Sequence, residues 1–149
     1  MLWRPCHGSE CRAGGAECGC EAMLAKLDDL HVLVVEDEAL LAVDLSLTLE
    51  DEGAIVSGPC MTLDAALNHS DLVDAAVLDV DLRGQPVFPV ADRLARDGKP
   101  FVFHTGRADL AELRDRYGEA VPIVTKPSSP AALVQTLVTA VSAGHPRPA

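Results

Sequence analysis

Side chains that could carry out phosphoryl chemistry occur at four separate places in the chain. They are the acidic pair Glu36 and Asp37, the acids Asp79 and Asp81, the hydroxyl of Thr105 and the amine of Lys126. Carboxylates that lie close together repel one another and raise each other's pKa unless a positive charge lies between them. An octahedral Mg²⁺ ion bound by one or two carboxylates and several waters is the usual solution. We therefore expect a Mg²⁺ site if the fold brings Glu36, Asp37 and Asp79 together.

The same set of side chains suits phosphoryl transfer. This reaction needs a nucleophile in line with the leaving group, and positive charge and donors around three equatorial oxygens. Asp79 could be the nucleophile, because carboxylates form aspartyl phosphates. The metal ion, the Lys126 ammonium and the Thr105 hydroxyl could then each contact one phosphoryl oxygen.

The chain contains five short apolar runs, and four of them precede these polar positions. They lie at residues 31–35, 54–57, 73–78, 101–104 and 121–124. Continuously apolar runs of four to six residues are typical of strands that are covered on both faces. We predict that these five runs form the strands of one sheet.

Segments with helical spacing of apolar residues lie between the runs. The predicted helices are one through Leu41, Leu45 and Leu49 that stops at Gly53, one from Thr62 or Asp64 to Asn68, one over 89–97, one over 108–116 and one that opens at Ser128-Ser129-Pro130. Strands that alternate with helices predict an α/β fold, a doubly wound five-stranded parallel sheet with helices on both faces. Because ligands bind beyond the carboxyl ends of such strands, the acids, the threonine and the lysine should converge there.

This arrangement resembles the receiver domain of two-component response regulators over residues 30–143. The resemblance rests on four motifs in the expected order, which are Val34-Val35-Glu36-Asp37-Glu38, Val77-Leu78-Asp79-Val80-Asp81-Leu82, Phe103-His104-Thr105-Gly106 and Thr125-Lys126-Pro127. It implies a flavodoxin-like (βα)5 fold with strand order 2-1-3-4-5. It also implies that the protein is a signalling switch rather than an enzyme, apart from catalysis of its own phosphorylation and dephosphorylation.

The resemblance implies a role for each site residue. Asp79 is the expected phosphoacceptor, Thr105 and Lys126 contact the phosphoryl group, and Asp37 and Asp79 bind Mg²⁺ directly. The backbone carbonyl of Asp81 is a third expected metal ligand, and Glu36 acts through water. The implied phosphoryl donor is a sensor histidine kinase. Output would pass through a bound partner, a phosphotransfer protein or competition for the kinase, and a homodimer on phosphorylation is left open.

Several residues depart from the receiver pattern. Ile123 stands where an aromatic switch residue is usual, and Asp81 stands where a neutral residue is common. Residues 100–106 resemble a subgroup of alphaproteobacterial receivers with a Pro-Phe-x-Phe-Ala-Thr-Gly-x-Tyr-like segment, from which His104 and Arg107 also depart. We expect His104 to be a partly buried filler and Cys60 to be a small buried hydrophobic residue.

Two other classes of function remain open at this stage. The Asp79-Val80-Asp81 segment also fits a haloacid-dehalogenase-like phosphatase, although the order of the acidic motifs is reversed, and Glu36 with Asp79 and Asp81 fits a Toprim-like phosphotransfer domain. A receiver-fold scaffold without phosphorylation is the third reading.

Composition narrows the class of protein further. The chain has 149 residues and a formal net charge of −11, which disfavours binding to nucleic acid or to anionic membranes. It contains no apolar run near the length of a membrane helix and no secretory signal, so we expect a cytoplasmic protein without membrane insertion. Residues 1–22 and 144–149 are predicted to be flexible. Cys6, Cys11, Cys18 and Cys20 in the first segment have unusual spacing for a zinc site.

Overall fold

Five short strands rich in β-branched, leucine and phenylalanine residues form a central parallel sheet. The computed structural model describes residues 27–143, so the predictions for 1–22, with their cysteines, and for 144–149 lie outside the described residues. The strands are β1 (His31–Val35), β2 (Ile55–Cys60), β3 (Ala75–Asp79), β6 (Phe101–Thr105) and β7 (Ile123–Thr125). They lie in the order β2-β1-β3-β6-β7, with every neighbouring pair parallel. The predicted doubly wound sheet and its strand order 2-1-3-4-5 are confirmed.

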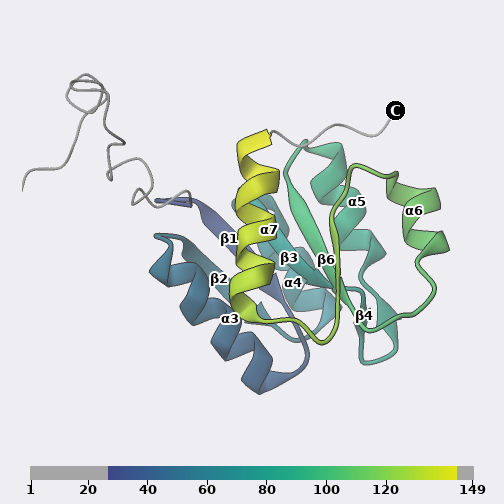
Figure 1. Ribbon diagram of the computed structural model, residues 1–149, viewed down its shortest axis with the longest axis horizontal. Helices are drawn as coiled ribbons and strands as arrows, with labels where there is room; N and C mark the ends of the chain where they lie inside the picture. The colour runs from purple at the N-terminus through teal and green to yellow at the C-terminus, as the bar shows by residue number, and fades with distance from the viewer. Residues whose placement is uncertain (1–26, 144–149) are drawn as a thin grey trace, which may run out of the picture.

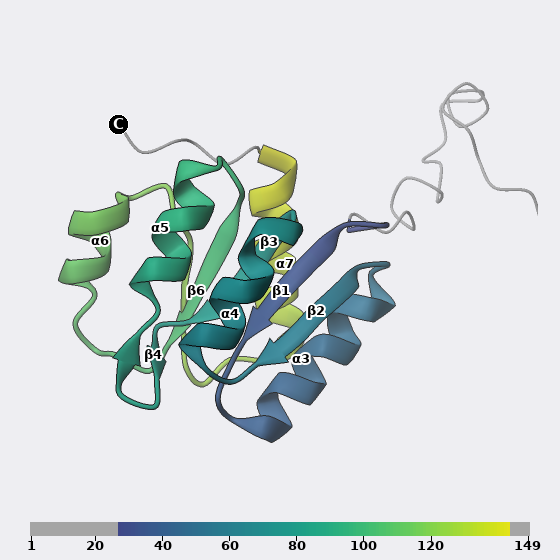
Figure 2. The same ribbon diagram turned by 180° about the vertical axis from the view of Figure 1, so that it is seen from behind.

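Helices cover both faces of the sheet. They are α3 (Ala39–Asp51), α4 (Leu63–His69), α5 (Phe88–Arg96), α6 (Ala111–Tyr117) and α7 (Pro130–Ala143), with a short 3₁₀ turn η1 (Ser70–Leu72) after α4. Helices α3 and α7 lie side by side on one face (Figure 1), and α4 and α5 cover the other face (Figure 2). No helix within residues 27–143 has the length and apolar character needed to cross a membrane.

Alternation along the strands divides the core into two layers. In β1, Val32 and Val34 pack in the cluster beneath α3 and α7, whereas Leu33 and Val35 pack in the cluster beneath α4 and α5. Successive side chains point to opposite sides of the sheet. Because helices cover both sides, both faces of β1 are buried. Cys60 lies in the second cluster at 3% exposure, as predicted.

Two helix starts have the caps expected from the sequence. The Ala65 N–H donates to the Thr62 Oγ1 at 3.2 Å, and the Ala132 N–H donates to the Ser129 Oγ at 3.1 Å. Each hydroxyl satisfies a backbone donor that has no partner inside its helix.

Several local features differ from the sequence predictions. Strand β2 extends to Cys60 rather than ending at 57, and β3 begins at Ala75 rather than at 73. An antiparallel hairpin, β4 (Asp81–Leu82) with β5 (Gln85–Pro86), follows β3, and its two-residue strands are too short to give a periodic signal. Strand β7 begins at Ile123 rather than at residue 121, because Pro122 has no N–H for the ladder. Helix α6 begins at Ala111 rather than at 108. At this start the Asp109 Oδ1 accepts the Ala111 N–H at 2.9 Å.

An irregularity in β2 determines where the first acidic residue lies. The β1–β2 register shifts between Leu33 and Val35, and the Glu36 N–H donates to the Cys60 carbonyl at 3.0 Å. Gly58 permits this shift with a φ of +105°, and a Cβ on Gly58 would lie 2.6 Å from the Cys60 nitrogen and 2.9 Å from the Val34 oxygen. Both of these are backbone atoms, so the strands would have to move apart to accept a side chain.

We predict that Gly58→Ala destabilises the protein more than Gly118→Ala. Gly118 has a φ of +82° but open space around its Cβ position, so its substitution costs backbone strain alone, about 1 kcal/mol. Gly58→Ala adds a backbone clash and should cost roughly 3 kcal/mol in total, measured by urea unfolding. Equal losses for the two variants would contradict the packing described for β1 and β2.

Candidate metal and phosphoryl site

The carboxyl ends of the sheet strands bring the predicted polar residues to one edge. Glu36 follows β1, Asp79 and Thr105 end β3 and β6, and Lys126 follows β7. The Lys126 Nζ donates to the Asp79 Oδ2 at 3.2 Å and to the Glu36 Oε1 at 3.4 Å. One ammonium group therefore joins two carboxylates that are 43 residues apart in sequence. The convergence predicted from the sequence is present for these residues.

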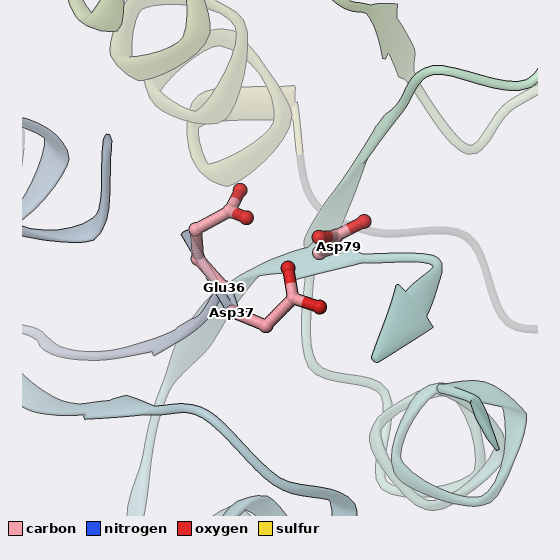
Figure 3. A group of neighbouring side chains, drawn as sticks. All are labelled: Glu36, Asp37 and Asp79. Carbon is pink, nitrogen blue, oxygen red and sulfur yellow. The ribbon is translucent and has the colours of Figure 1, made fainter. Parts of the chain in front are cut away.

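Three carboxylates form a group with the dimensions of a small cation site. One oxygen from each of Glu36, Asp37 and Asp79 lies within 4.8 Å of the others. Figure 3 shows the three side chains coming from the loop after β1 and from the end of β3. Ligand oxygens around an octahedral Mg²⁺ are separated by about 3–4 Å, so small rotations of these side chains would suffice to bind it. The donors are hard oxygens, as Mg²⁺ requires, and the residues present fit this ion.

Burial and neighbouring groups shift the pKa values of the Glu36 and Asp79 carboxyls in opposite directions. Glu36 and Asp79 are exposed by 1% and 5%. Burial raises the pKa of Asp79, the neighbouring Glu36 raises it further, and the Lys126 charge offsets only part of this effect. Burial also raises the pKa of Glu36, but contacts with His104, Asp79 and the Glu38 N–H, together with the Lys126 charge, outweigh it, so the Glu36 pKa is lowered. Asp79 is thus the carboxyl whose negative charge most needs a cation.

The Lys126 amine remains positively charged in this setting. Burial lowers the pKa of Lys126, but the charges of Asp79 and Glu36 and its hydrogen bonds to them raise it above its ordinary value. A third carboxylate, Glu38, lies 3.7 Å from the Nζ. The site therefore presents a permanent cation beside the carboxyl predicted to accept the phosphoryl group.

Arg107 binds the side chain of Asp81, which is not one of the three clustered carboxylates. The Arg107 Nε and Nη2 donate to the two Asp81 oxygens at 2.8 and 2.7 Å, and the Nη1 donates to the Glu112 Oε1 at 3.0 Å. This fork lowers the pKa of Asp81 and raises that of Arg107. Asp81, which departs from the receiver pattern, and Arg107, which departs from the alphaproteobacterial subgroup, thus form one ion pair. A metal contact through the Asp81 backbone carbonyl stays a prediction.

Thr105 is buried and its hydroxyl is already engaged. The Thr105 Oγ1 accepts the Arg107 N–H at 3.0 Å, and the Lys126 N–H donates to the Thr105 carbonyl at 2.7 Å. The threonine is 1% exposed. The hydroxyl accepts this bond with its oxygen, so its own hydrogen stays available to donate to a group on Asp79.

An aromatic side chain from α6 fills the core near the position where the receiver pattern has its aromatic residue. Tyr117 packs with its ring centroid 5.1 Å from that of Phe103, and its hydroxyl donates to the Asp92 Oδ1 at 2.6 Å. Ile123 packs against the same core cluster. The sequence analysis did not single out Tyr117, because its position after β6 gave no signal of its tertiary neighbours.

His104 differs from the expectation of a partly buried filler. The ring is 1% exposed, its Nε2 lies 3.0 Å from the Ser128 Oγ, and its Nδ1 lies 3.7 Å from the Glu36 Oε2. Burial of a polar ring costs free energy unless its nitrogens find hydrogen-bond partners. The groups that face the two nitrogens therefore determine what His104 does. Neither the contact with Ser128 nor that with Glu36 was expected from the sequence.

Comparison with known proteins places this geometry in a family. No family model and no curated protein matches the sequence. Among solved structures, SdrG from Sphingomonas melonis Fr1 is 35% identical with a TM-score of 0.64, over 78% of this chain and 98% of that one. A response regulator receiver protein from Sinorhizobium medicae is 26% identical with a TM-score of 0.66, over 78% and 98% of the two chains. The protein belongs to the response regulator receiver family.

A third similar structure shows the same fold inside a longer protein. The response regulator PhyR from Brucella abortus is 22% identical with a TM-score of 0.64. The match covers 83% of this chain and 52% of PhyR, so this chain spans about half the length of that regulator.

We predict that Asp79→Asn stabilises the Mg²⁺-free protein and abolishes its stabilisation by Mg²⁺. A carboxyl with a raised folded-state pKa binds its proton more tightly when folded, so its ionisation costs stability above its unfolded pKa. The amide removes that cost, so the variant should melt higher than wild type in EDTA at pH 8, by a margin that shrinks as the pH falls. At ten times its Kd, Mg²⁺ should add about 1.4 kcal/mol to wild type alone.

The matched control for this comparison is Asp115→Asn, an exposed acid on α6. It should leave both the melting temperature in EDTA and the Mg²⁺ effect unchanged. Equal stabilisation of wild type and Asp79→Asn by Mg²⁺ would contradict the assignment of Asp79 to the metal site.

Proposed function

We propose that the protein is a response regulator that accepts a phosphoryl group on Asp79 from a sensor histidine kinase and then changes its binding to a partner. The observation that carries this proposal is the bridge from Lys126 to both Asp79 and Glu36, beside a group of three carboxylates with the dimensions of a Mg²⁺ site. Such a role belongs in the cytoplasm, where ATP-dependent kinases act, and that location is part of the proposal.

In the transfer step, an Asp79 carboxylate oxygen attacks the phosphorus of a phosphohistidine. A P–O bond forms as the P–N bond breaks, and the donor imidazole leaves with the electron pair of that bond. Lys126, already 3.2 Å from Asp79, moves its ammonium onto a phosphoryl oxygen. Asp37 and Asp79, with Glu36 acting through water, would hold a Mg²⁺ ion, and that ion when bound would supply positive charge for the phosphoryl oxygens.

Thr105 links the phosphoryl group to the surface of the protein. Its hydroxyl can donate to a phosphoryl oxygen while the oxygen still accepts the Arg107 N–H, so movement of Thr105 toward Asp79 moves the loop that carries Arg107. The Arg107 side chain is bound to Glu112 in the first turn of α6, so a shift of this loop displaces the start of α6. Phosphorylation biases this equilibrium by its different interaction with the two states, for which a few kcal/mol is enough.

The ion pair at Asp81 favours a regulator over a phosphatase. In the phosphatase reading, the second acid of Asp79-Val80-Asp81 must exchange protons with substrate. Here both Asp81 oxygens are bound by Arg107, which lowers the Asp81 pKa. A carboxylate held ionised in this way is a poor general acid. The Toprim-like reading needs Asp81 in the metal group, but the side-chain cluster consists of Glu36, Asp37 and Asp79.

We predict that acetyl phosphate with Mg²⁺ adds one phosphoryl group to wild type and to Asp81→Asn, but none to Asp79→Asn. Asp81→Asn is the matched control because it also neutralises one carboxylate of this segment, and its side chain lies outside the metal group. Intact mass spectrometry measures the product, and omission of Mg²⁺ should slow its formation by about tenfold or more, because the metal neutralises phosphoryl charge.

Three outcomes would count against the proposal. Phosphorylation of the Asp79→Asn variant would show that the acceptor is a different residue. Continuous release of phosphate from phosphomonoesters would support the phosphatase instead. If the wild-type protein is not modified, the remaining interpretation is a receiver-fold scaffold without phosphorylation.

A further inference from the structure

A histidine occupies a strand position where this fold normally buries apolar side chains. His104 lies in β6 directly before Thr105 and pairs with Asp79 of β3 and Val124 of β7. Because side chains alternate along a strand, His104 shares a face with Val102, which packs in the cluster beneath α3 and α7. The proposed transfer reaction does not use this ring, so its burial calls for a separate explanation.

The two ring nitrogens face different groups. Nε2 lies 3.0 Å from the Ser128 hydroxyl oxygen, within hydrogen-bonding distance. Nδ1 is buried without a hydrogen-bond partner, and a Glu36 carboxylate oxygen lies 3.7 Å from it. An unprotonated Nδ1 would direct its lone pair at a carboxylate, which is repulsive, whereas an Nδ1–H would direct a donor at it. The Ser128 hydroxyl can then donate to Nε2.

We propose that Ser128, His104 and Glu36 form a positioning relay, in which the imidazole carries its hydrogen on Nδ1 and orients the Glu36 carboxylate for the metal site. His104 is thus a positioning residue that acts through Glu36, and its effect on Mg²⁺ binding rests on the proposed function of that acid. A small closure of the 3.7 Å gap converts the contact into a charge-assisted hydrogen bond.

The relay explains how Glu36 keeps its orientation during transfer. Lys126 binds one Glu36 oxygen, Oε1, and His104 faces the other, Oε2. When the ammonium of Lys126 moves to the phosphoryl group, the imidazole remains to hold the carboxylate. Lys126 and Ser128 belong to one loop, so this loop contacts Glu36 twice, directly through the lysine and through the imidazole from Ser128.

The first test measures which ring nitrogen carries the hydrogen. Two-bond ¹H–¹⁵N spectra of the wild-type protein without Mg²⁺ should show a protonated Nδ1 for His104. A hydrogen on Nε2 alone would overturn the proposal. The Ser128→Ala variant should retain the Nδ1 hydrogen but shift the Nε2 resonance, because the donor to that nitrogen is removed. This measurement does not depend on phosphorylation or on metal.

The second test separates positioning from packing. In His104→Asn the amide can place a donor near the position of Nδ1, whereas His104→Leu fills similar space without a donor. We expect His104→Leu to weaken Mg²⁺ binding by about tenfold or more, as loss of an outer partner of a metal ligand commonly does, and His104→Asn to remain within about threefold of wild type. Calorimetry measures both constants, and melting curves verify that the variants are folded.

The exposed His69 on α4 supplies the control, since His69→Leu should not change Mg²⁺ binding. Wild-type affinity in folded His104→Leu would overturn the relay. If wild type itself binds no Mg²⁺, the proposed function fails, while the position of the ring hydrogen still decides whether the relay exists.

Discussion

The arrangement of the site depends on the repulsion between two buried carboxylates. Glu36 and Asp79 are almost fully enclosed, and the ammonium of Lys126 lies between them at 3.4 and 3.2 Å. Enclosure weakens the screening that water would provide, so each negative charge affects the acidity of the other. A site held in this balance gains from a divalent cation. In the proposed transfer the two carboxylates also lose their internal cation as Lys126 turns to the phosphoryl group, which would link metal binding to the transfer chemistry.

Arg107 is the second cation of this region, and it binds acids other than those that Lys126 binds. Arg107 binds both oxygens of Asp81 and one of Glu112, while Lys126 serves Asp79 and Glu36. The chain therefore places an additional acid near the acceptor without adding its charge to the metal group. The same arginine offers its backbone N–H to Thr105, which connects the acid site, the loop after β6 and the start of α6.

The repeating features of the fold could be predicted from the sequence, and the single contacts could not. Apolar runs and helical spacing predicted the five strands and the edge where Asp79, Thr105 and Lys126 meet, and the resemblance to receivers supplied the strand order. Each of these depends on a pattern spread over many residues. The hairpin at Asp81–Leu82 has no such pattern. The Arg107–Asp81 pair joins residues 26 positions apart, and nothing periodic marks it.

The departures from the receiver pattern and from its alphaproteobacterial subgroup were the signal available for the missed contacts. Asp81 and Arg107 each looked anomalous when considered alone, yet opposite charges at two unusual positions are what an ion pair requires. His104 likewise stood out as a polar residue in an apolar run, but its partners Glu36 and Ser128 come from segments 68 residues before and 24 residues after it. Contacts between residues so far apart in sequence become visible only when the strands are placed side by side.

The most direct test of the central claim is a crystal structure of the protein with Mg²⁺ and beryllium fluoride, a mimic of the phosphoryl group. The account predicts the fluoride adduct on an Asp79 oxygen, the metal bound by Asp37 and Asp79, and the Lys126 Nζ and Thr105 Oγ1 moved onto the adduct. A site without ion or adduct, with Lys126 still bridging Glu36 and Asp79, would contradict it.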